Sequence, residues 1–226
     1  MKATSVEMGL AGAPAAAETL DYSALLRFAA DLAARATIVV LFSIMAVRFG
    51  SDFINTGRLT GLFLLASEAL VVVLTVFRRS AVTVDRSFKA RVLTTVSILG
   101  PPLLAPAAVA PLAAEGITVA LSCAGLAVVI AGKITLGRSF ALLPANRGVV
   151  STGLYKVVRH PIYMGYLVTH VAFLVASPSL WNIVALVAAD AALLVRAVCE
   201  EQTLAQDPAY REYQTRVRWR VAPGIF

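Results

Sequence analysis

The residues best suited to chemistry lie in GLYKVVRHPIYMG, residues 153–165, where charged and aromatic side chains precede an apolar run. Pro161 biases His160 toward an extended conformation and favours a helix that begins at the proline. Arg159 and His160 then stand at a helix N-terminus, whose free amides and dipole favour anions. The carboxylate or phosphate of an amphiphilic ligand would bind there.

A second set of polar residues follows the next two apolar runs. Glu200 and Glu201 come directly after the second of these runs, and a tail rich in tyrosine and arginine follows them. Tyr155 and Tyr163, from the first segment, offer aromatic faces for a base or a cation. The two glutamates would neutralise the positive end of the same ligand. We therefore expect the two segments to converge on one water-facing cavity.

Several other kinds of site are not supported. The chain has no GxGxxG after a strand, no GxxxxGK[ST], no HExxH and only two histidines. Cys123 and Cys199 are far apart in sequence, which favours neither a disulfide framework nor a metal site. The charge of +7 comes from basic residues in short loops between apolar runs, so we expect no nucleic-acid partner.

Composition indicates an integral membrane protein. Hydrophobic residues make up 59% of the 226 residues, charged residues only 15%, and mean hydropathy is +0.80. An ordinary soluble domain is about 25% charged. We predict one all-α, multi-pass transmembrane helical bundle of five to six membrane segments over residues 1–226. The apolar segments are Leu32–Phe49, Leu59–Phe77, Val92–Val109, Ile117–Thr135, Ile162–Ala176 and Leu180–Val198.

Two of these segments are unusual. Ile162–Ala176 would span about 22 Å, less than the roughly 30 Å of a hydrocarbon core, so we expect it to form a helical hairpin with Leu180–Val198. Gly100-Pro101-Pro102 must break or kink the third segment, because proline removes an amide donor and clashes with the preceding turn. The last two segments are therefore expected to hold a shallow, interfacial site.

The tail after the sixth segment is expected to form a C-terminal cytoplasmic amphipathic segment. Asp207-Pro208 resembles an N-cap followed by proline at the first helical position. The helix that they open would carry Tyr210, Tyr213 and Val217 on one side.

Charge asymmetry predicts the topology. The loop between the second and third segments holds five basic residues against Asp85, whereas the next loop offers only Glu115. The first loop should therefore be cytoplasmic, as should both termini, the site and the loop over residues 136–160. This places the protein in the cytoplasmic membrane, which is the inner membrane in a bacterium. The basic residues that fix this orientation are Arg78, Arg79, Arg86, Lys89, Arg91, Arg138, Arg147, Lys156 and Arg159.

Taken together, the motifs resemble a known family. GLYKVVRHPIYMGY, then EEQTL about 40 residues later, then YREYQTRVRWRVAP, is similar to the C-terminal signature of the isoprenylcysteine carboxyl methyltransferase and phospholipid methyltransferase superfamily. The likeness covers roughly residues 136–224, and the four earlier segments carry no motif. Gly153-Leu154-Tyr155 stands where members often have Gly-Pro-Tyr, and RVRWRVAP replaces a plainer arginine-proline ending near the expected substrate.

The resemblance implies a three-part organisation and a set of site residues. Residues 1–26 would be a loose tail, 27–135 a four-helix membrane scaffold and 136–226 the cofactor-binding catalytic region. Glu201 and Arg216 would be catalytic, and Arg216, Arg218 and Tyr213 would contact substrate, with Arg220 a further candidate. The S-adenosylmethionine pocket would be lined by Tyr155, Arg159, His160, Pro161, Tyr163, Gly165, Glu200 and Glu201.

By the same resemblance, the activity is an S-adenosylmethionine-dependent methyl transfer to a lipophilic acceptor that enters from the bilayer, most like that of protein-S-isoprenylcysteine carboxyl O-methyltransferase. Displacement at a sulfonium needs alignment and a dry pocket more than a metal. A carboxylate acceptor needs an arginine to hold it, and an amine needs a base such as glutamate. Alternatives are a phospholipid or small-molecule N- or S-methyltransferase, an NADPH-dependent membrane reductase, and a non-enzymatic transporter or assembly factor.

Simpler structural roles remain open for several residues. The tail arginines could anchor the chain to anionic lipid, and the tyrosines could belong to an interfacial belt. Glu68 and Asp190 are costly inside a bilayer, and we expect each to pair with Lys133 or Arg35. We expect His170 to pack within the bundle, and Gly125 and Gly132 to mark close helix contact.

Overall fold

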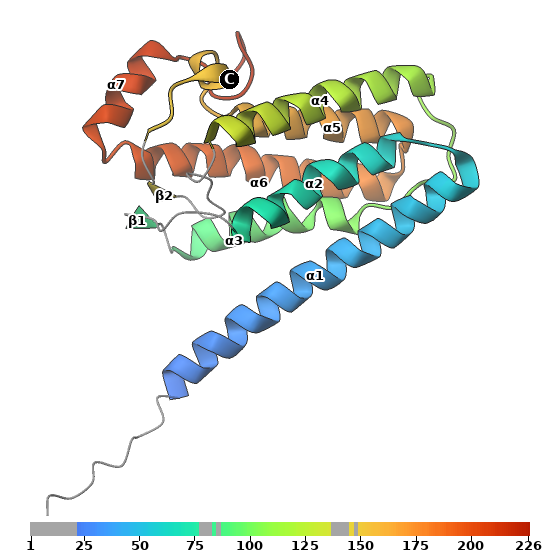
Figure 1. The fold of residues 1–226 in the computed structure, drawn as a ribbon, viewed down its shortest axis with the longest axis horizontal. Coiled ribbons are helices and arrows are strands. Elements are labelled where there is room, and N and C mark those ends of the chain that lie inside the picture. Colours follow the sequence, from blue (N-terminus) through green and yellow to red (C-terminus); the bar gives the residue numbers. More distant parts are fainter. Residues whose placement is uncertain (1–21, 77–82, 85–86, 137–144, 147–148) are drawn as a thin grey trace, which may run out of the picture. The chain divides into compact units, whose positions relative to one another are not determined.

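The computed structural model describes residues 22–76, 83–84, 87–136, 145–146 and 149–226 (Figure 1). The chain divides into residues 1–37 and residues 38–226, and the packing reported below is that of the second unit. Two-residue strands β1 (Thr83–Val84) and β2 (Ala145–Asn146) pair antiparallel, and η1 (Pro101–Leu103) and η3 (Gly153–Lys156) are 3₁₀ turns. The α-helices are α1 (Tyr22–Thr56), α2 (Thr60–Val76), α3 (Phe88–Leu99), α4 (Glu115–Leu136), α5 (Pro161–Ala176), α6 (Leu180–Leu204) and α7 (Pro208–Arg216).

Three of the described helices are long and apolar enough to cross a membrane: α1 over Val39–Thr56, α4 and α6. Shorter apolar helices cover Thr60–Ala69 and Pro161–Ala176. The helical membrane architecture predicted from sequence is thus confirmed. The number of crossings, five to six, and their orientation stay predictions, as does the cytoplasmic location of α7.

The sequence predicts the ends of α4 and α5 closely but not the end of α6. Helix α6 was predicted to end at Val198 but continues for six more residues to Leu204, so Glu200 and Glu201 lie within it. The polar residues did not end the helix, because two arginines, a histidine and a tyrosine contact the two carboxylates, as described below. The acidic pair is therefore held on a helix rather than on a loop.

The predicted break in the third apolar segment is confirmed. Helix α3 ends at Leu99, and the two prolines that follow form the turn η1. Gly100 lies so close to α6 that a Cβ atom there would overlap the Ala189 Cβ. After η1 the chain is tied to the start of α6, because Asn182 accepts a hydrogen bond from the Ala105 amide (3.2 Å) and donates one to its carbonyl (2.9 Å).

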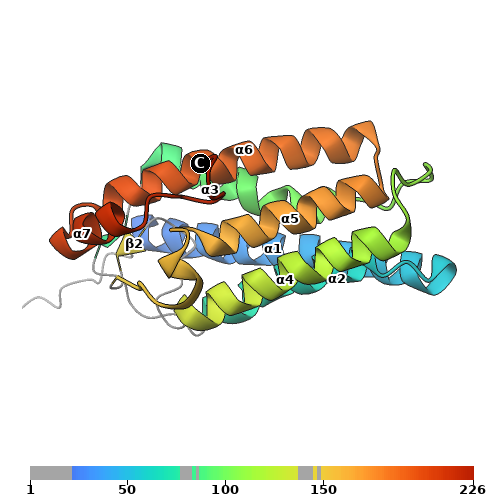
Figure 2. The same ribbon diagram turned by 90° about the horizontal axis from the view of Figure 1, so that it is seen from above.

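Helices α4 and α5 lie side by side and pack through glycines (Figure 2). A Cβ atom on Gly165 would lie 2.7 Å from the Gly125 carbonyl oxygen, and one on Gly132 would lie 2.8 Å from Ile162 Cγ1. The close helix contact predicted for Gly125 and Gly132 is confirmed. It fixes the start of α5, and with it His160, against the end of α4.

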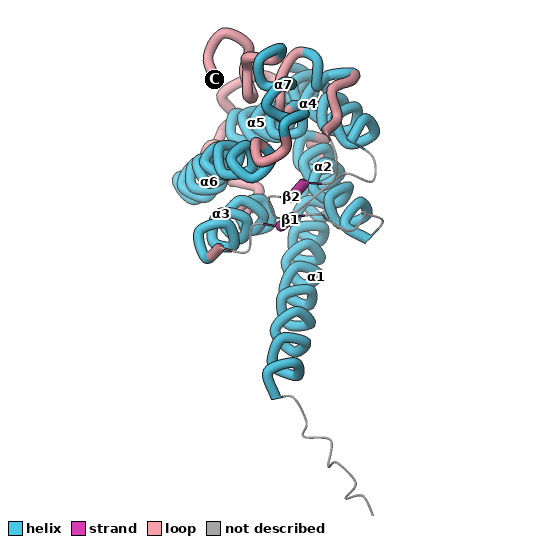
Figure 3. The backbone as a smooth tube through the Cα atoms, turned by 90° about the vertical axis from the view of Figure 1, so that its left-hand side faces the viewer, coloured by secondary structure: helices cyan, strands magenta, loops and turns pink. Residues whose placement is uncertain are grey.

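The two ends of α4 mark the two ends of this unit. At the first, the Leu59 amide donates to Glu115 Oε1 (3.0 Å), and the Leu112 amide donates to the Val175 carbonyl (2.8 Å). At the second end lie η3, the start of α5, the end of α6 and α7 (Figure 3). Five of the basic residues used to predict the topology lie outside the described residues: Arg78, Arg79, Arg86, Arg138 and Arg147.

A buried polar cluster lies inside the bundle. His170 Nδ1 on α5 is 2.6 Å from Asp190 Oδ1 on α6, and His170 Nε2 is 3.8 Å from Glu68 Oε1 on α2. The Lys133 ammonium on α4 donates to the Ser67 carbonyl (3.2 Å). Among the described side chains, the partner of Asp190 is His170 on the neighbouring helix of the hairpin rather than Lys133, whereas the Arg35 side chain lies outside those described.

Candidate functional site

The start of α5 has the geometry that the proline predicts. His160 is the N-cap residue, with φ −127° and ψ 63°, and Pro161 is the first residue of the helix. The His160 side chain does not cap the first turn, so it is directed elsewhere. Both residues are buried, which places the imidazole inside the protein at the end of the helix.

The C-terminal tail pairs with the chain just before this helix. The Arg159 amide donates to the Trp219 carbonyl (2.9 Å), and the His160 amide donates to the Arg220 carbonyl (2.7 Å). Val158 and Trp219 form a parallel bridge. These bonds place two segments about 60 residues apart side by side and set the direction of the Arg220 side chain.

Glu201 is the centre of a buried ionic cluster. Its Oε1 atom lies 3.0 Å from Arg159 Nε and 3.2 Å from His160 Nε2, and its Oε2 atom accepts a hydrogen bond from Arg220 Nε (3.0 Å). The Glu201 side chain is only 5% exposed and the Arg159 side chain 8%. A carboxylate this far from water needs such partners, because an unpaired buried charge is strongly destabilising.

One atom in this cluster has spare bonding capacity. Arg159 Nε is buried and close to Glu201, but its N–H is not aligned to form a hydrogen bond with any described residue. It is therefore a donor available to an anionic group. The free amides at the start of α5 lie next to it in the chain and favour the same charge.

Glu200 faces a different set of partners from Glu201. Its Oε2 atom accepts a hydrogen bond from the Tyr163 hydroxyl (2.7 Å). The Tyr163 ring stacks on His160 at 5.1 Å between centroids, and the Arg196 guanidinium lies 5.6 Å from the same ring. Arg196 belongs to none of the motifs, although its position four residues before Glu200 places both on one face of α6.

Three tyrosines pack beneath the site. Tyr155 from η3 and Tyr210 and Tyr213 from α7 form a buried cluster with Val217, and the Tyr213 hydroxyl donates to the Tyr155 carbonyl (2.7 Å). Burial raises the pKa of Tyr213 to about 12, while Arg159 opposes and Glu201 adds to the increase. Burial also raises the pKa of Tyr155 and of Tyr210 far above the ordinary value, with a further contribution from Glu200 to each. Tyr210 and Tyr213 form the buried side of α7, and Asp207 caps that helix as predicted.

Three of the predicted site residues lie elsewhere. Gly165 contacts α4 rather than the Glu201 cluster. Arg216 is exposed and lies 3.8 Å from the exposed Glu212, one turn earlier on α7, and Arg218 is exposed as well. Arg220, two residues further along the tail, is the tail arginine that reaches Glu201.

The structure therefore brings together Arg159-His160-Pro161, the acidic pair Glu200-Glu201 and the tail, which are the three parts of the signature described above. Residues 117–206 match the model of the isoprenylcysteine carboxyl methyltransferase (ICMT) family. The resemblance indicated by the motifs is confirmed over this segment. A comparison with curated proteins found no match.

The ICMT match begins in α4, covers α5 and α6, and ends just before α7. It includes Arg159, His160, Glu200 and Glu201, whereas Arg220 and the rest of the tail lie beyond it. The match to a methyltransferase family over this segment suggests a methyltransferase, and the three apolar helices fit a membrane protein.

Proposed function

We propose that this chain transfers a methyl group from S-adenosylmethionine to a lipophilic acceptor, in the manner of an ICMT-type enzyme. The observation that carries the proposal is the Glu201 cluster, which gathers Arg159 and His160 from before α5, Glu201 from α6 and Arg220 from the tail. Residues 136–226 would form the cofactor-binding region and residues 27–135 the membrane scaffold.

The residues present fit the charges of the cofactor. S-adenosylmethionine carries a carboxylate, an ammonium, a sulfonium and an adenine ring, and it supplies an electrophilic methyl group. Arg159 Nε is a buried donor available to the carboxylate. Glu200, bound by the Tyr163 hydroxyl through one oxygen only among the described residues, retains acceptor capacity for a cationic group. Tyr155, Tyr163 and Pro161 contribute apolar surface around these charges.

Glu201 is better suited to position the neighbouring side chains than to accept a proton. Its two oxygens already contact Arg159, His160 and Arg220, so it orients three cationic or basic side chains at once. We infer that Glu201 is a positioning residue and that Glu200 is the carboxylate nearer to ligand. The catalytic role expected for Arg216 gains no support from its exposed position. Arg220 is more suitable for a role in the site, because it contacts Glu201.

The acceptor enters from the bilayer in this proposal, because α4, α5 and α6 are apolar and bring the site to one end of the bundle. Incubation of the purified protein with a lipid extract and a labelled methyl donor, followed by mass analysis, tests it. Labelled lipid that is formed by wild type and greatly reduced in Glu201→Gln supports methyl transfer. Glu212→Gln, the same change at an exposed glutamate of α7, is the matched control. Absence of labelled product with wild type would count against the proposal.

A further inference from the structure

A surface patch at the site end of the bundle joins two distant parts of the sequence. The bridge between Val158 and Trp219 places the residues after η3 beside the strand-like tail that follows α7. Val158, Val217 and Val221 point inward and are at most 7% exposed. Several exposed residues next to these valines point outward, whereas Arg220 is directed to Glu201. We call the outward-facing set the basic–tryptophan patch: Lys156, Val157, Arg216, Arg218 and Trp219.

The charges of this patch are largely unneutralised. Arg216 has only the loose contact with Glu212, in which both side chains are more than 60% exposed. Within the described part of the chain, neither Lys156 nor Arg218 forms an ion pair. Lys156 and Arg218 lie on the two segments that the bridge joins, and Arg216 ends α7 just before the second segment. All three are exposed, and they would attract an anionic surface.

The apolar members make a soluble acidic partner less suitable than a membrane. Val157 is 54% exposed and Trp219 is 39% exposed, so an indole and a valine stand among the cations. Tryptophan concentrates at the boundary between headgroups and acyl chains, and lysine and arginine bind anionic headgroups beside it. The patch also lies where α5 begins and α6 ends, and the end of an apolar spanning helix is the part that meets the headgroup region.

We propose that the basic–tryptophan patch binds the anionic headgroups of the surrounding bilayer. The tail that carries Arg218 and Trp219 is the same tail that holds the backbone of Arg159 and His160 and supplies Arg220 to Glu201. Headgroup binding therefore stabilises the tail in the position that completes the Glu201 cluster. This role of lipid does not depend on the identity of the reaction, although it would regulate the site proposed above.

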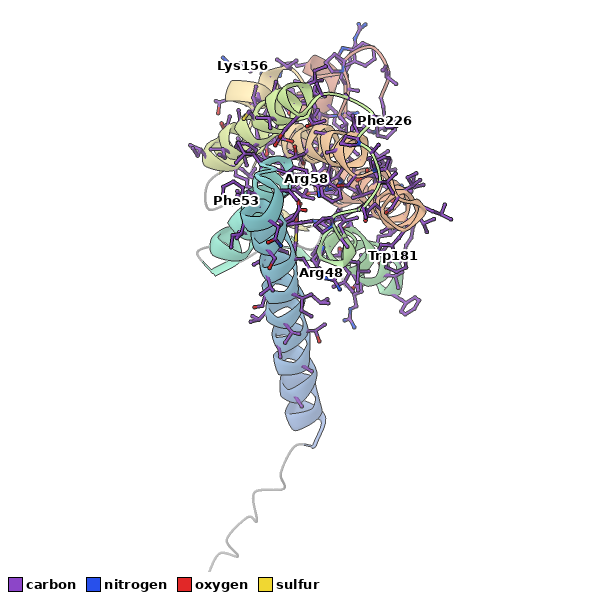
Figure 4. All side chains as sticks on the ribbon, turned by 90° about the vertical axis from the view of Figure 1, so that its right-hand side faces the viewer. Arg48, Phe53, Arg58, Lys156, Trp181 and Phe226 are labelled. Atoms are coloured by element: carbon purple, nitrogen blue, oxygen red, sulfur yellow. The ribbon has the colours of Figure 1, made fainter. Side chains whose placement is uncertain are left out.

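Trp219 provides a direct probe. The chain has two tryptophans, and Trp181 lies on the outside of the bundle near the far end of α6 (Figure 4). In a Trp181→Phe background, Trp219 is the sole indole. The protein is reconstituted into nanodiscs of phosphatidylcholine alone or with phosphatidylglycerol, and Trp219 emission is measured with and without brominated acyl chains.

We expect Trp219 emission to shift to the blue, and quenching to rise at least twofold, when phosphatidylglycerol is present. High salt should reverse most of the change, because it screens exposed charges. In the double variant Lys156→Gln with Arg218→Gln, Trp219 emission and quenching should be the same with phosphatidylglycerol as in phosphatidylcholine alone. The double variant Lys156→Arg with Arg218→Lys should keep the blue shift and the increased quenching. Arg58→Gln is the control, because it removes a charge near the opposite end of α4.

Equal emission in the two lipids, or an equal effect of Arg58→Gln, would overturn the proposal. An equal shift on adding inorganic phosphate to phosphatidylcholine nanodiscs would also overturn it, since a free anion would then suffice. The result is separable from the proposed function: a lipid response in a protein that binds no S-adenosylhomocysteine would support the patch and contradict the methyltransferase.

Discussion

Glu201 and Arg220 connect α6 to the C-terminal tail through a hydrogen-bonded ion pair of 3.0 Å between Oε2 and Nε. The other oxygen of Glu201 contacts Arg159 and His160, so one carboxylate links three segments. The tail is therefore part of the site, even though it lies outside the segment that matches the ICMT family. The contribution of the tail can be tested separately from that of the helices.

Arg220→Ala should weaken S-adenosylhomocysteine binding by about tenfold, because it removes a charge-assisted hydrogen bond to Glu201. Arg220→Lys should recover part of the affinity, since it restores the charge but not the planar donor. Calorimetric titration of the detergent-solubilised variants measures both. Identical affinities for wild type and Arg220→Ala would show that the tail does not contribute to ligand binding.

Tyr163→Phe should lower both stability and affinity. The substitution keeps the ring that stacks on His160 but removes the hydroxyl that donates to Glu200. A lost hydrogen bond to a charged group costs about 1.5–3 kcal/mol. Thermal unfolding measures the first effect and titration the second. An unchanged melting temperature together with unchanged affinity would show that the bond to Glu200 is not formed in solution.

Gly165→Ala should destabilise the protein by about 1–3 kcal/mol, because the new methyl would meet the α4 backbone. Gly116→Ala is the matched control within the first turn of α4, where nothing lies within 4 Å of the added methyl. Alanine is the better helix former, so this control should be neutral or slightly stabilising. Thermal unfolding of both variants tests whether Gly165 serves helix packing, and equal melting temperatures would contradict that role.

The tyrosines beneath the site predict a loss of stability at alkaline pH. Tyrosine has a pKa of about 10 in an unfolded chain, and Tyr213 has a pKa of about 12 in the folded protein. Because the folded state holds its proton more tightly, this stabilisation is complete below pH 10 and is lost as the pH rises toward 12. Melting temperatures across this range should fall in wild type and fall less in Tyr213→Phe. A melting temperature independent of pH up to 12 would contradict the burial of these phenols.

The buried polar cluster inside the bundle predicts that His170 and Asp190 are energetically coupled. Asp190→Leu and His170→Phe should each cost about 3 kcal/mol, because each leaves the other side chain without its paired group. The double variant His170→Phe with Asp190→Leu should lose less than the sum of these two single variants, since neither member of the pair is then left behind. Unfolding free energies of wild type and the three variants complete the cycle. Additive losses would show that the two side chains do not interact.

Much of the fold could be predicted from hydropathy and from proline, because these act locally. Pro161 fixes the start of α5, Gly100 and the two following prolines end α3, and Asp207 caps α7. The end of α6 was predicted too early, because partners distant in sequence stabilise Glu200 and Glu201 inside the helix.

The site was predictable in its centre but not at its edges. Arg159, His160 and Glu201 belong to motifs, whereas the choice among Arg216, Arg218 and Arg220 depends on backbone pairing with Trp219. Their spacing of two residues would suit a strand with all three on one face. The turn from α7 into the tail instead leaves two of them outside and directs the third to Glu201.

The central claim is that the Glu201 cluster forms the binding site for S-adenosylmethionine. Calorimetric titration of the solubilised protein with S-adenosylhomocysteine tests it most directly, with NADPH titrated in parallel. The account predicts binding of S-adenosylhomocysteine but not NADPH by wild type, loss of that binding in Glu201→Gln and His160→Ala, and its retention in Glu212→Gln. Wild-type protein that binds no S-adenosylhomocysteine, or equal binding by Glu201→Gln and Glu212→Gln, would contradict it.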